Sequence, residues 1–373
     1  MEYKSFTDCV DLVGTACQPF DGDKKYISTG AVDTDHICED DIEIVDFDGR
    51  PSRANLQANP GDILFAKMQA TKKTLAIDEM LSKNVYSTGF FAVKAKKGVI
   101  TDRCLYHLLT SDAFLSQKDK NCSGATQKAI TNTGLEKIII RVPDYSIQDD
   151  IAKQLDLASS IIQKRKQEIL SLDNLIKARF VEMFGHPDKN EKGWEMNSFR
   201  DICTVRQGLQ IPISKRVTNY EEGCYEYITV QYLHGGKDRE YIKNPKATVI
   251  CTKDDILMTR TGNTGMVITG VDGVFHNNFF LIDFNRDKYD KDFLVQYLNL
   301  DMIQADIIRR AGTSTIPDLN HGEFYKIQIF EPPMQLQNEF NTFLKQTDKS
   351  KFTVQKALDK AQLLFDSLMQ KYF

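Results

Sequence analysis

Residues 147–184 read IQDDIAKQLDLASSIIQKRKQEILSLDNLIKARFVEMF, and this run contains no proline and no glycine. Apolar side chains recur along it in steps that nearly alternate between four and three residues, with Arg165 filling one slot of the series. The apolar or small members are Ile147, Ile151, Leu155, Ala158, Ile162, Ile169, Leu172, Ile176, Phe180 and Met183. Such spacing places side chains in one stripe along one face of a helix. The sequence therefore predicts a long amphipathic helix over residues 146–187.

Residues 334–373 repeat this pattern, with Lys351 in the polar slot. The second stripe contains Phe340, Leu344, Val354, Leu358, Phe365 and Leu368. An exposed apolar stripe of this length would promote aggregation in water, so each helix needs a partner that covers its stripe. The simplest partner for each stripe is the other stripe, which predicts an antiparallel coiled-coil pair with a globular module at each end. The alternative is that both stripes belong to one compact helical core.

The sequence outside these helices also contains an internal repeat. Short matches follow one another in the same order in both halves, and their offset settles near 189 residues. The matched pairs include Phe6 with Phe199, Asp62 with Asp255, Phe91 with Phe280, Leu105 with Leu294, Gly124 with Gly312 and Pro143 with Pro332. An ordered series over the whole chain indicates an internal duplication.

Each copy begins with a globular part of mixed strands and helices. In the first copy, short apolar runs predict strands, residues 102–117 predict a helix, and a final strand at 137–142 stops at Pro143. The predicted boundaries are domain 1 at 1–145, helix 1 at 146–187, domain 2 at 188–333 and helix 2 at 334–373. The predicted fold class is α+β: two tandem mixed α/β domains separated by two long antiparallel helices, with pseudo-two-fold symmetry.

Composition places the chain among ordinary globular proteins. Its 373 residues are 41% hydrophobic and 27% charged, with a net charge of −4. This charge argues against a protein that coats nucleic acid indiscriminately, although local basic patches stay open. No apolar run is long enough to span a bilayer, and the first residues do not resemble a secretory signal. The eight cysteines form no Cys-x-x-Cys pair, so we expect reduced thiols, no zinc site and a cytoplasmic protein.

Motifs for catalysis are missing from the sequence. It contains no phosphate-binding loop, no dinucleotide-binding glycine motif and no nucleophile elbow. Pro143-Asp144 and Pro317-Asp318 leave open a metal-dependent nuclease, but Glu323 and Lys326 lie three residues apart instead of the two that such a site requires. Both pairs more simply mark turns. The sequence therefore predicts a protein that is not an enzyme.

Taken together, these features resemble the specificity (S) subunits of bacterial type I restriction-modification systems. The resemblance covers the whole chain and rests on two modules that each end in a strand, a proline and a long helix. Its matching pieces are 60–64 with 254–257, 123–128 with 311–315, Ile147-Gln148 with Leu336-Gln337, and the run 179–184 that closes helix 1. Each piece is short, and their order and duplication make the match specific.

The resemblance implies a function. Each globular domain would read one half of a split sequence in double-stranded DNA, while the helix pair sets the unread gap and docks two modification (methyltransferase) subunits. Restriction subunits would then join. S-adenosylmethionine, ATP and magnesium would belong to these partners, so this chain would hold no cofactor and no metal, and would not contact a membrane. The alternatives are a stand-alone sequence-specific DNA-binding protein, a scaffold without DNA, and the nuclease.

Candidate DNA contacts are loops that combine lysine or arginine with asparagine or glutamine. These side chains reach the edges of guanine and adenine and also bind phosphates. In domain 1 we nominate Lys67, Gln69, Lys72, Lys73, Gln127 and Lys128; in domain 2 we nominate Arg206, Gln207, Lys215, Arg216, Arg260 and Asn263. For each charge the alternative is a solvated surface residue. Four tyrosines are candidates for stacking or for core packing: Tyr26, Tyr220, Tyr225 and Tyr227.

Overall fold

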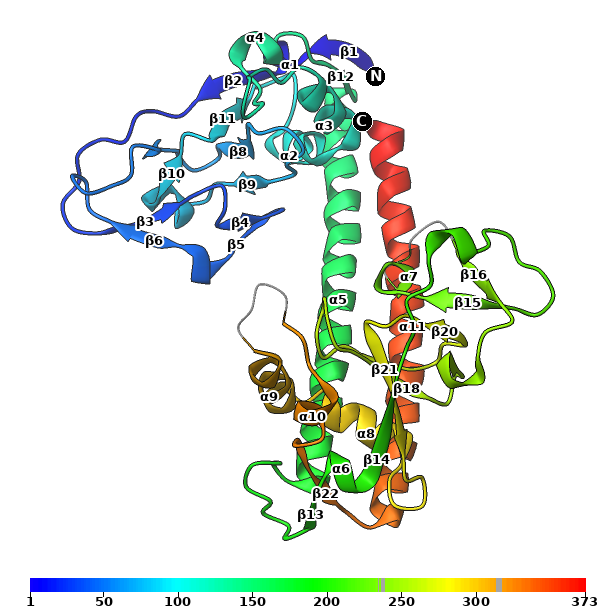
Figure 1. The fold of residues 1–373 in the computed structure, drawn as a ribbon. Coiled ribbons are helices and arrows are strands. Elements are labelled where there is room, and N and C mark those ends of the chain that lie inside the picture. The colour runs from blue at the N-terminus through cyan, green and yellow to red at the C-terminus, as the bar shows by residue number, and fades with distance from the viewer. Residues whose placement is uncertain (234, 236–238, 313–316) are drawn as a thin grey trace. The chain divides into compact units, whose positions relative to one another are not determined.

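The computed structural model describes residues 1–233, 235, 239–312 and 317–373. The chain divides into two compact units, of which unit 1 comprises Met1–Gln167 with Gln355–Phe373 and unit 2 comprises Glu168–Val354. Each unit contains one globular domain and about half of each long helix (Figure 1). These helices are α5 (Gln148–Phe184, 37 residues) and α11 (Met334–Tyr372, 39 residues). Among the described residues, no helix combines the length and the apolarity that crossing a bilayer requires.

The two long helices run antiparallel. In unit 1 the early part of α5 and the late part of α11 share one apolar cluster, which includes Ile151 and Met369. In unit 2 the late part of α5 and the early part of α11 share another, which includes Ile176 and Phe340. The start of each helix therefore lies in the same unit as the end of the other, which is the antiparallel pairing that the sequence predicted.

The side chains of the predicted stripes face inward. Eight are buried, namely Ile151, Leu155, Ile162, Ile176, Phe180, Phe340, Leu344 and Val354. The other five are partly buried, namely Ile169, Leu172, Leu358, Phe365 and Leu368. Ile147, which precedes the first residue of α5, is 40% exposed and lies outside this packing. Because none of the thirteen side chains within the helices is exposed, burial of apolar surface stabilises the packing along both helices.

Glycine sets the end of α5. The helix ends at Phe184, three residues before the predicted boundary, and Gly185 follows with φ +84°. The amide of Gly185 still donates to the carbonyl of Val181 at 2.8 Å. A left-handed glycine after the last helical residue is a common stop signal, because it accepts positive φ without steric cost.

The domain of unit 1 contains two four-stranded sheets and two strand pairs. One sheet has the order β2-β11-β8-β9, the other has the order β6-β3-β10-β7, and β1 pairs with β12. The strands are β1 (Glu2–Ser5), β2 (Val10–Val13), β3 (Lys24–Ile27), β4 (Val32–Asp33), β5 (His36–Ile37), β6 (Glu43–Val45), β7 (Ala54–Leu56), β8 (Ile63–Ala66), β9 (Thr74–Ala76), β10 (Val85–Ser87), β11 (Phe90–Ala95) and β12 (Ile139–Val142). The helices are α1 (Phe6–Cys9), α2 (Asp102–Thr110), α3 (Asp112–Lys120) and α4 (Asn132–Leu135).

The segment predicted as one helix over 102–117 is in fact two helices. Ser111 separates α2 from α3, and its hydroxyl accepts a hydrogen bond from the amide of Phe114 at 3.2 Å. A serine in this position caps the start of a helix, because its oxygen satisfies an amide that has no partner within the helix. The single apolar pattern did not reveal this break.

The domain of unit 2 repeats this topology. Its sheets have the orders β14-β21-β18-β19 and β16-β15-β20-β17, and β13 pairs with β22. The strands are β13 (Glu195–Ser198), β14 (Cys203–Gln207), β15 (Cys224–Ile228), β16 (Tyr241–Lys243), β17 (Ile250–Cys251), β18 (Ile256–Thr259), β19 (Val267–Ile268), β20 (Gly273–Phe275), β21 (Phe279–Phe284) and β22 (Gln328–Glu331). The helices are α6 (Phe199–Ile202), α7 (Val230–Leu233), α8 (Lys291–Leu298), α9 (Asp301–Ala311) and α10 (His321–Phe324).

Strand register supports the duplication. In unit 1 Phe91 of β11 lies opposite Phe65 of β8, and in unit 2 Phe280 of β21 lies opposite Met258 of β18. Phe91 and Phe280 were matched by sequence alone. The predicted repeat is therefore a repeat of structure.

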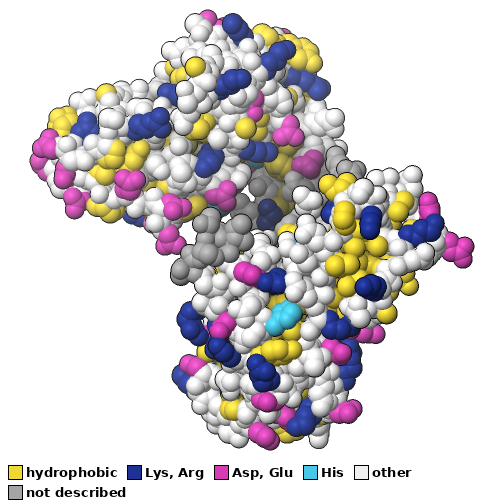
Figure 2. Space-filling model, viewed as in Figure 1, with side chains coloured by type: hydrophobic (Ala, Val, Ile, Leu, Met, Phe, Trp, Pro, Cys, Tyr) yellow, Lys and Arg dark blue, Asp and Glu magenta, His cyan; other side chains and the backbone are white. Residues whose placement is uncertain are grey.

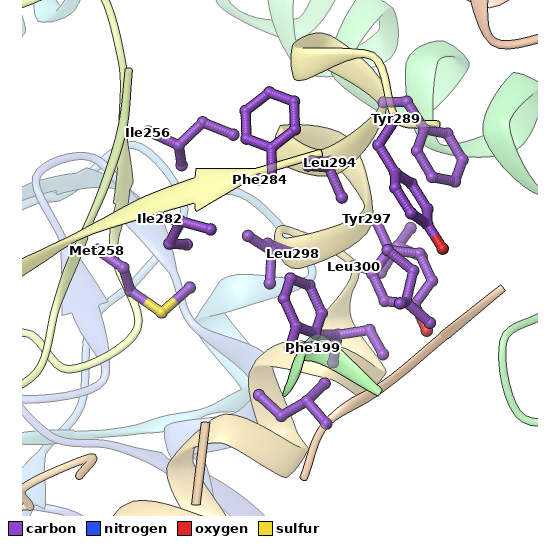
Figure 3. Close-up of a cluster of buried hydrophobic side chains, with 14 of the residues drawn as sticks. Phe199, Ile256, Met258, Ile282, Phe284, Tyr289, Leu294, Tyr297, Leu298 and Leu300 are labelled. Atoms are coloured by element: carbon purple, nitrogen blue, oxygen red, sulfur yellow. The ribbon is translucent and has the colours of Figure 1, made fainter. Parts of the chain in front are cut away.

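The core of unit 2 joins the sheet to the helices. Side chains from β18 and β21 point toward α8, whose Leu294, Tyr297 and Leu298 complete the cluster (Figure 3). The ring of Phe180 from α5 lies 5.4 Å from that of Phe293 and 5.4 Å from that of Phe340 in α11. Both long helices thus contribute to the core of the domain. Truncating a buried aromatic ring in such a cluster typically costs about 3–5 kcal/mol.

A buried glutamine in the first turn of α5 binds the domain of unit 1. Gln148 has no exposed surface. Its Oε1 accepts a hydrogen bond from the amide of Thr101 at 2.8 Å, and its Nε2 donates to the carbonyls of Val99 and Pro143, both at 2.9 Å. Hydrogen bonds are directional, whereas apolar packing is not. This side chain therefore fixes the angle at which the helix meets the domain.

The same arrangement recurs in unit 2. Gln337 of α11 is also fully buried. Its Oε1 accepts from the amide of Asp290 at 2.8 Å, and its Nε2 donates to the carbonyls of Lys288 at 2.9 Å and Pro332 at 2.8 Å. The sequence resemblance had included this glutamine pair only as a marker of where each helix opens.

We predict that Gln148→Met loosens the joint in unit 1. The variant keeps a side chain of similar length but leaves three backbone groups without their partners, and for the buried carbonyl of Pro143 alone this costs about 1–3 kcal/mol. Hydrogen exchange of the Thr101 amide should become about tenfold faster or more, since 1.4 kcal/mol corresponds to a factor of ten. Gln154→Met, at an exposed position of α5, is the matched control. Unchanged protection of Thr101 in the Gln148 variant would contradict the role of the glutamine.

Candidate nucleic-acid interface

Two of the nominated loops of unit 1 lie side by side. Residues 67–73 follow β8, and residues 122–129 follow α3. Met68 and Ala129 form an antiparallel bridge between them. The amide of Gln69 donates to the carbonyl of Lys128, and the amide of Ile130 donates to that of Lys67, both at 2.9 Å. We call this surface the unit 1 loop pair; it brings all six nominated residues of domain 1 together.

Three of these six side chains bind the protein itself. Nζ of Lys67 donates to the carbonyl of Thr88 at 2.9 Å and lies 4.3 Å from the centre of the Phe91 ring. Nε2 of Gln69 donates to the carbonyl of Asp119 at 3.2 Å, and Nζ of Lys73 donates to that of Thr29 at 2.7 Å. Burial lowers the pKa of Lys67. These residues build the loop pair rather than extend from it.

The other three face solvent. The side chain of Lys72 is 51% exposed. Among the residues that the structure describes, its only ion pair is a 3.8 Å contact with exposed Asp112. Gln127 and Lys128 are exposed as well. Exposed ion pairs contribute little stability, so Lys72 can exchange its partner for a phosphate at small cost.

Unit 2 has a corresponding pair of segments. The turn 260–265 follows β18, and the amide of Leu319 donates to the carbonyl of Arg260 at 2.9 Å. The hydroxyl of Thr264 donates to the carbonyl of Pro317 at 2.9 Å. The intervening 313–316, with the matched motif at 313–315, lies outside the described residues. The two domains thus use equivalent places with different side chains.

Arg260 is held by an acidic partner in this turn. Its Nε and Nη2 donate to the two carboxylate oxygens of Asp318 at 2.9 and 2.7 Å. This planar, two-point contact orients the guanidinium, whose side chain is 20% exposed. Asn263 of the same turn is exposed.

The remaining nominated residues of domain 2 lie elsewhere on it. Nη1 of Arg206 donates to the carbonyl of Thr248 at 3.2 Å, and Gln207 and Lys215 are exposed. Arg216 is tied to the carbonyl of Ile211 at 2.7 and 2.9 Å and to Glu240 at 2.8 Å. Arg216 therefore has a structural role in this segment, and Nε2 of Gln207 donates to the carbonyl of Asn277 at 3.4 Å, whereas exposed Lys215 can reach a ligand.

The four tyrosines divide equally. Tyr26 and Tyr227 are buried, in line with core packing, while Tyr220 is 69% and Tyr225 is 40% exposed. Leu209 and Ile213 of the same domain are exposed too. Figure 2 shows that hydrophobic side chains gather on the surface of unit 2 around β15 and β20. Exposed aromatic rings offer flat faces on which bases stack.

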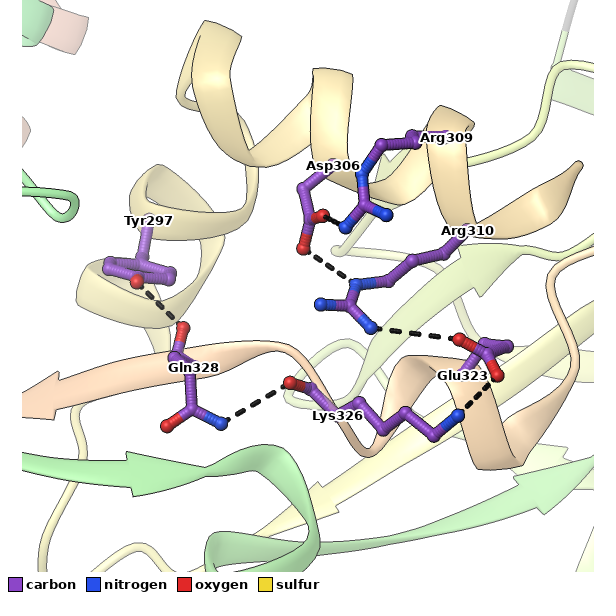
Figure 4. A network of polar contacts seen from close by, with 7 residues as sticks. All are labelled: Tyr297, Asp306, Arg309, Arg310, Glu323, Lys326 and Gln328. Carbon is purple, nitrogen blue, oxygen red and sulfur yellow. Dashed lines mark hydrogen bonds and ion pairs between the residues drawn. The ribbon is translucent and has the colours of Figure 1, made fainter.

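An ion network joins α9 to α10 (Figure 4). Arg310 lies between Asp306, at 2.7 Å, and Glu323, at 3.6 Å, and Lys326 binds Glu323 at 2.6 Å. Arg309 also pairs with Asp306. Three positive side chains thus share two carboxylates, and their contacts brace α9 against α10.

The geometry offers the nuclease alternative no metal site within the described part of the chain. There, no group of three or more His, Cys, Asp or Glu side chains could hold a metal ion. Asp318 is engaged by Arg260, and Glu323 by Lys326.

Comparison with protein families gives a match over both halves of the chain. The model of the type I restriction modification DNA specificity domain matches residues 15–171 and again residues 191–363. The chain belongs to this family. The two matches coincide with the two copies of the repeat, and each extends into a long helix.

Named relatives of the family agree. The type I restriction enzyme MjaVIII specificity subunit of Methanocaldococcus jannaschii is 23% identical over 195 residues, which is 52% of this chain. That match spans 44% of the relative's length. The S subunit of a type I restriction-modification system from M. genitalium has a TM-score of 0.58 at 15% identity, covering 100% of this chain and 96% of its own. A chain from a study of type I R-M complex assembly has a TM-score of 0.58 at 16% identity, covering 100% and 97%. These structures share the fold.

We predict that the exposed lysines of the unit 1 loop pair bind DNA phosphates. A Lys72→Ala/Lys128→Ala double variant should weaken DNA binding for all sequences and reduce the slope of log K against log salt by about 2, because two phosphate contacts are lost. Titrations at several salt concentrations measure this slope.

The control is Lys94→Ala/Lys97→Ala. These exposed lysines lie at the opposite end of β11 from the loop pair, because Phe90 lies beside Ala66 and Lys94 comes after the last paired residue of β8. Equal changes in slope for both double variants would contradict a DNA contact at the loop pair.

Proposed function

We propose that this chain is the DNA-reading subunit of a type I restriction-modification complex, without catalysis of its own. Each domain reads one half of a bipartite target in double-stranded DNA. The observation that carries this proposal is the duplication: two domains of one topology, mounted on a shared antiparallel helix pair, present different side chains at equivalent loops. Membership of the DNA specificity family supports it.

Differences between the loops account for two different half-sites. The unit 1 loop pair exposes Lys72, Gln127 and Lys128, whereas the turn of unit 2 carries Arg260 and Asn263. Arginine and lysine reach guanine, and asparagine and glutamine reach adenine, through distinct hydrogen-bond patterns in the major groove. Each domain therefore selects its own short sequence.

The helix pair sets the unread gap between the half-sites. Neither α5 nor α11 contains a proline or a glycine, and each is about 55–60 Å long at 1.5 Å per residue. Half-sites read from one face of DNA are separated by about 34 Å or a multiple of it. A continuous, paired helix is stiff on this scale, whereas a flexible linker would blur the spacing.

The outer faces of the helices bind the partners. Large apolar side chains are exposed there, including Leu157 at 64% and Leu170 at 63% on α5, and Leu363 at 70% and Leu364 at 57% on α11. Where such side chains adjoin, as Leu363 and Leu364 do, they offer apolar surface that a partner protein can cover. We assign it to two modification subunits, which bring S-adenosylmethionine; restriction subunits bring ATP and magnesium. The complex works in the cytoplasm.

We predict that exchanging residues 188–333 for the corresponding domain of another family member changes only one half of the recognised sequence. The joint at Gln337 and the core around Phe180 would have to be kept, so the exchange should retain both helices intact. Methylated positions of the assembled complex report the sequence. A change in both halves would contradict independent reading.

We also predict that inserting one helical turn into both α5 and α11 lengthens the gap by about 2 base pairs, from a rise of about 6 Å against 3.4 Å per base pair. The half-site sequences should stay unchanged. Insertion into α11 alone is the control, because it breaks the register of the two stripes and should impair the protein instead of shifting the gap. A double insertion with the original gap would refute the spacer role.

A further inference from the structure

A fully buried lysine lies beneath the unit 1 loop pair. Lys118 of α3 has no exposed surface. Its Nζ donates to the carbonyls of Met68 at 2.9 Å and Thr71 at 2.8 Å, lies 3.5 Å from the carbonyl of Ala66, and lies 3.4 Å from Oδ1 of Asp119. A lysine ammonium has three donors, and the three hydrogen bonds of Lys118 all go to backbone carbonyls of residues 66–71, while Asp119 contributes an ion pair. Burying a charge without partners is costly, so the hydrogen bonds of Lys118 are needed to keep its ammonium inside the domain.

The loop that Lys118 holds is strained. Ala70 has φ +57°, a left-handed conformation that residues with a Cβ rarely adopt. Such a conformation is sterically unfavourable and persists only where its surroundings enforce it. Met68 and Thr71, the two close partners of Lys118, flank Ala70 in the chain, and the hydroxyl of Thr71 also donates to the carbonyl of Met68 at 2.5 Å.

Unit 2 holds its equivalent turn in another way. The repeat offset of 189 places Ile307, which is fully buried and apolar, at the position of Lys118. There the turn rests on Gln304, whose Nε2 donates to the carbonyl of Gly265 at 3.0 Å. Lys118 therefore serves only one of the two domains.

We infer that Lys118 is a specificity-determining positioning residue for the first half-site. It acts through the loop, without touching DNA: it fixes the path of residues 66–71, and so the place of exposed Lys72 and of Lys128, whose carbonyl is bound by Gln69. This inference rests on the proposed function and goes beyond it, because it names a buried residue that controls one half of the sequence.

Lys118→Met tests the inference in the assembled methyltransferase complex. The variant keeps the aliphatic stem and removes the ammonium, so the loop loses its inner anchor. Methylation mapped over a library of randomised targets should relax at one or more positions of the first half-site, with discrimination there falling about tenfold or more. The second half-site should stay as in the wild type. Ile307→Met is the matched control at the equivalent buried position beneath the turn of unit 2, and it should leave the first half-site unchanged.

A second variant covers the case in which Lys118→Met fails to fold. Lys118→Gln keeps a polar side chain with two donors but is one bond shorter, so it should fold, recover part of the contact with the loop and show a weaker relaxation at the same positions. Wild-type discrimination at the first half-site in a folded Lys118 variant would overturn the inference, and so would an equal relaxation of both half-sites. If the wild-type complex itself methylates no bipartite sequence, the proposed function fails instead.

Discussion

Burial of the two helix stripes inside both domain cores is the interaction on which the rest of the structure depends. Phe180 of α5 packs on Phe293 in the domain of unit 2, while Ile151 and Leu155 of the same helix belong to the core of unit 1. Neither domain is closed without the helices, and neither helix has its apolar face covered without the domains. Each half of the helix pair is therefore fixed to the domain of its own unit.

Directional contacts add what apolar packing lacks. Gln148 and Gln337 each bind three backbone groups of their own domain, with the same donors and acceptors in both units. Hydrophobic burial tolerates small rotations, but a fully satisfied buried amide does not, because each lost hydrogen bond leaves a buried group unpaired. The duplication thus preserved the joint while the loops diverged: Lys118 anchors the loop 66–71 in unit 1, and Gln304 anchors the turn 260–265 in unit 2.

The sequence predicted what depends on periodicity and order. The long helices, their antiparallel pairing and the repeated domains follow from spacing that any reader can count, and the structure has all three. The loops were harder, because charge alone does not say where a side chain points. Lys67, Gln69 and Lys73 bind the domain's own backbone, whereas Lys118 reads as a surface lysine of a helix and is fully buried.

We infer that the two domains of this chain each recognise one half of a DNA target. The methylation pattern that the chain directs tests this inference most directly. The chain should be expressed with its methyltransferase partner in a host that lacks both, and the methylated bases should be mapped across the genome by long-read sequencing. We expect one split motif, with two half-sites at a fixed gap, that vanishes when this chain is omitted. A continuous motif, or a motif that persists without the chain, would contradict it.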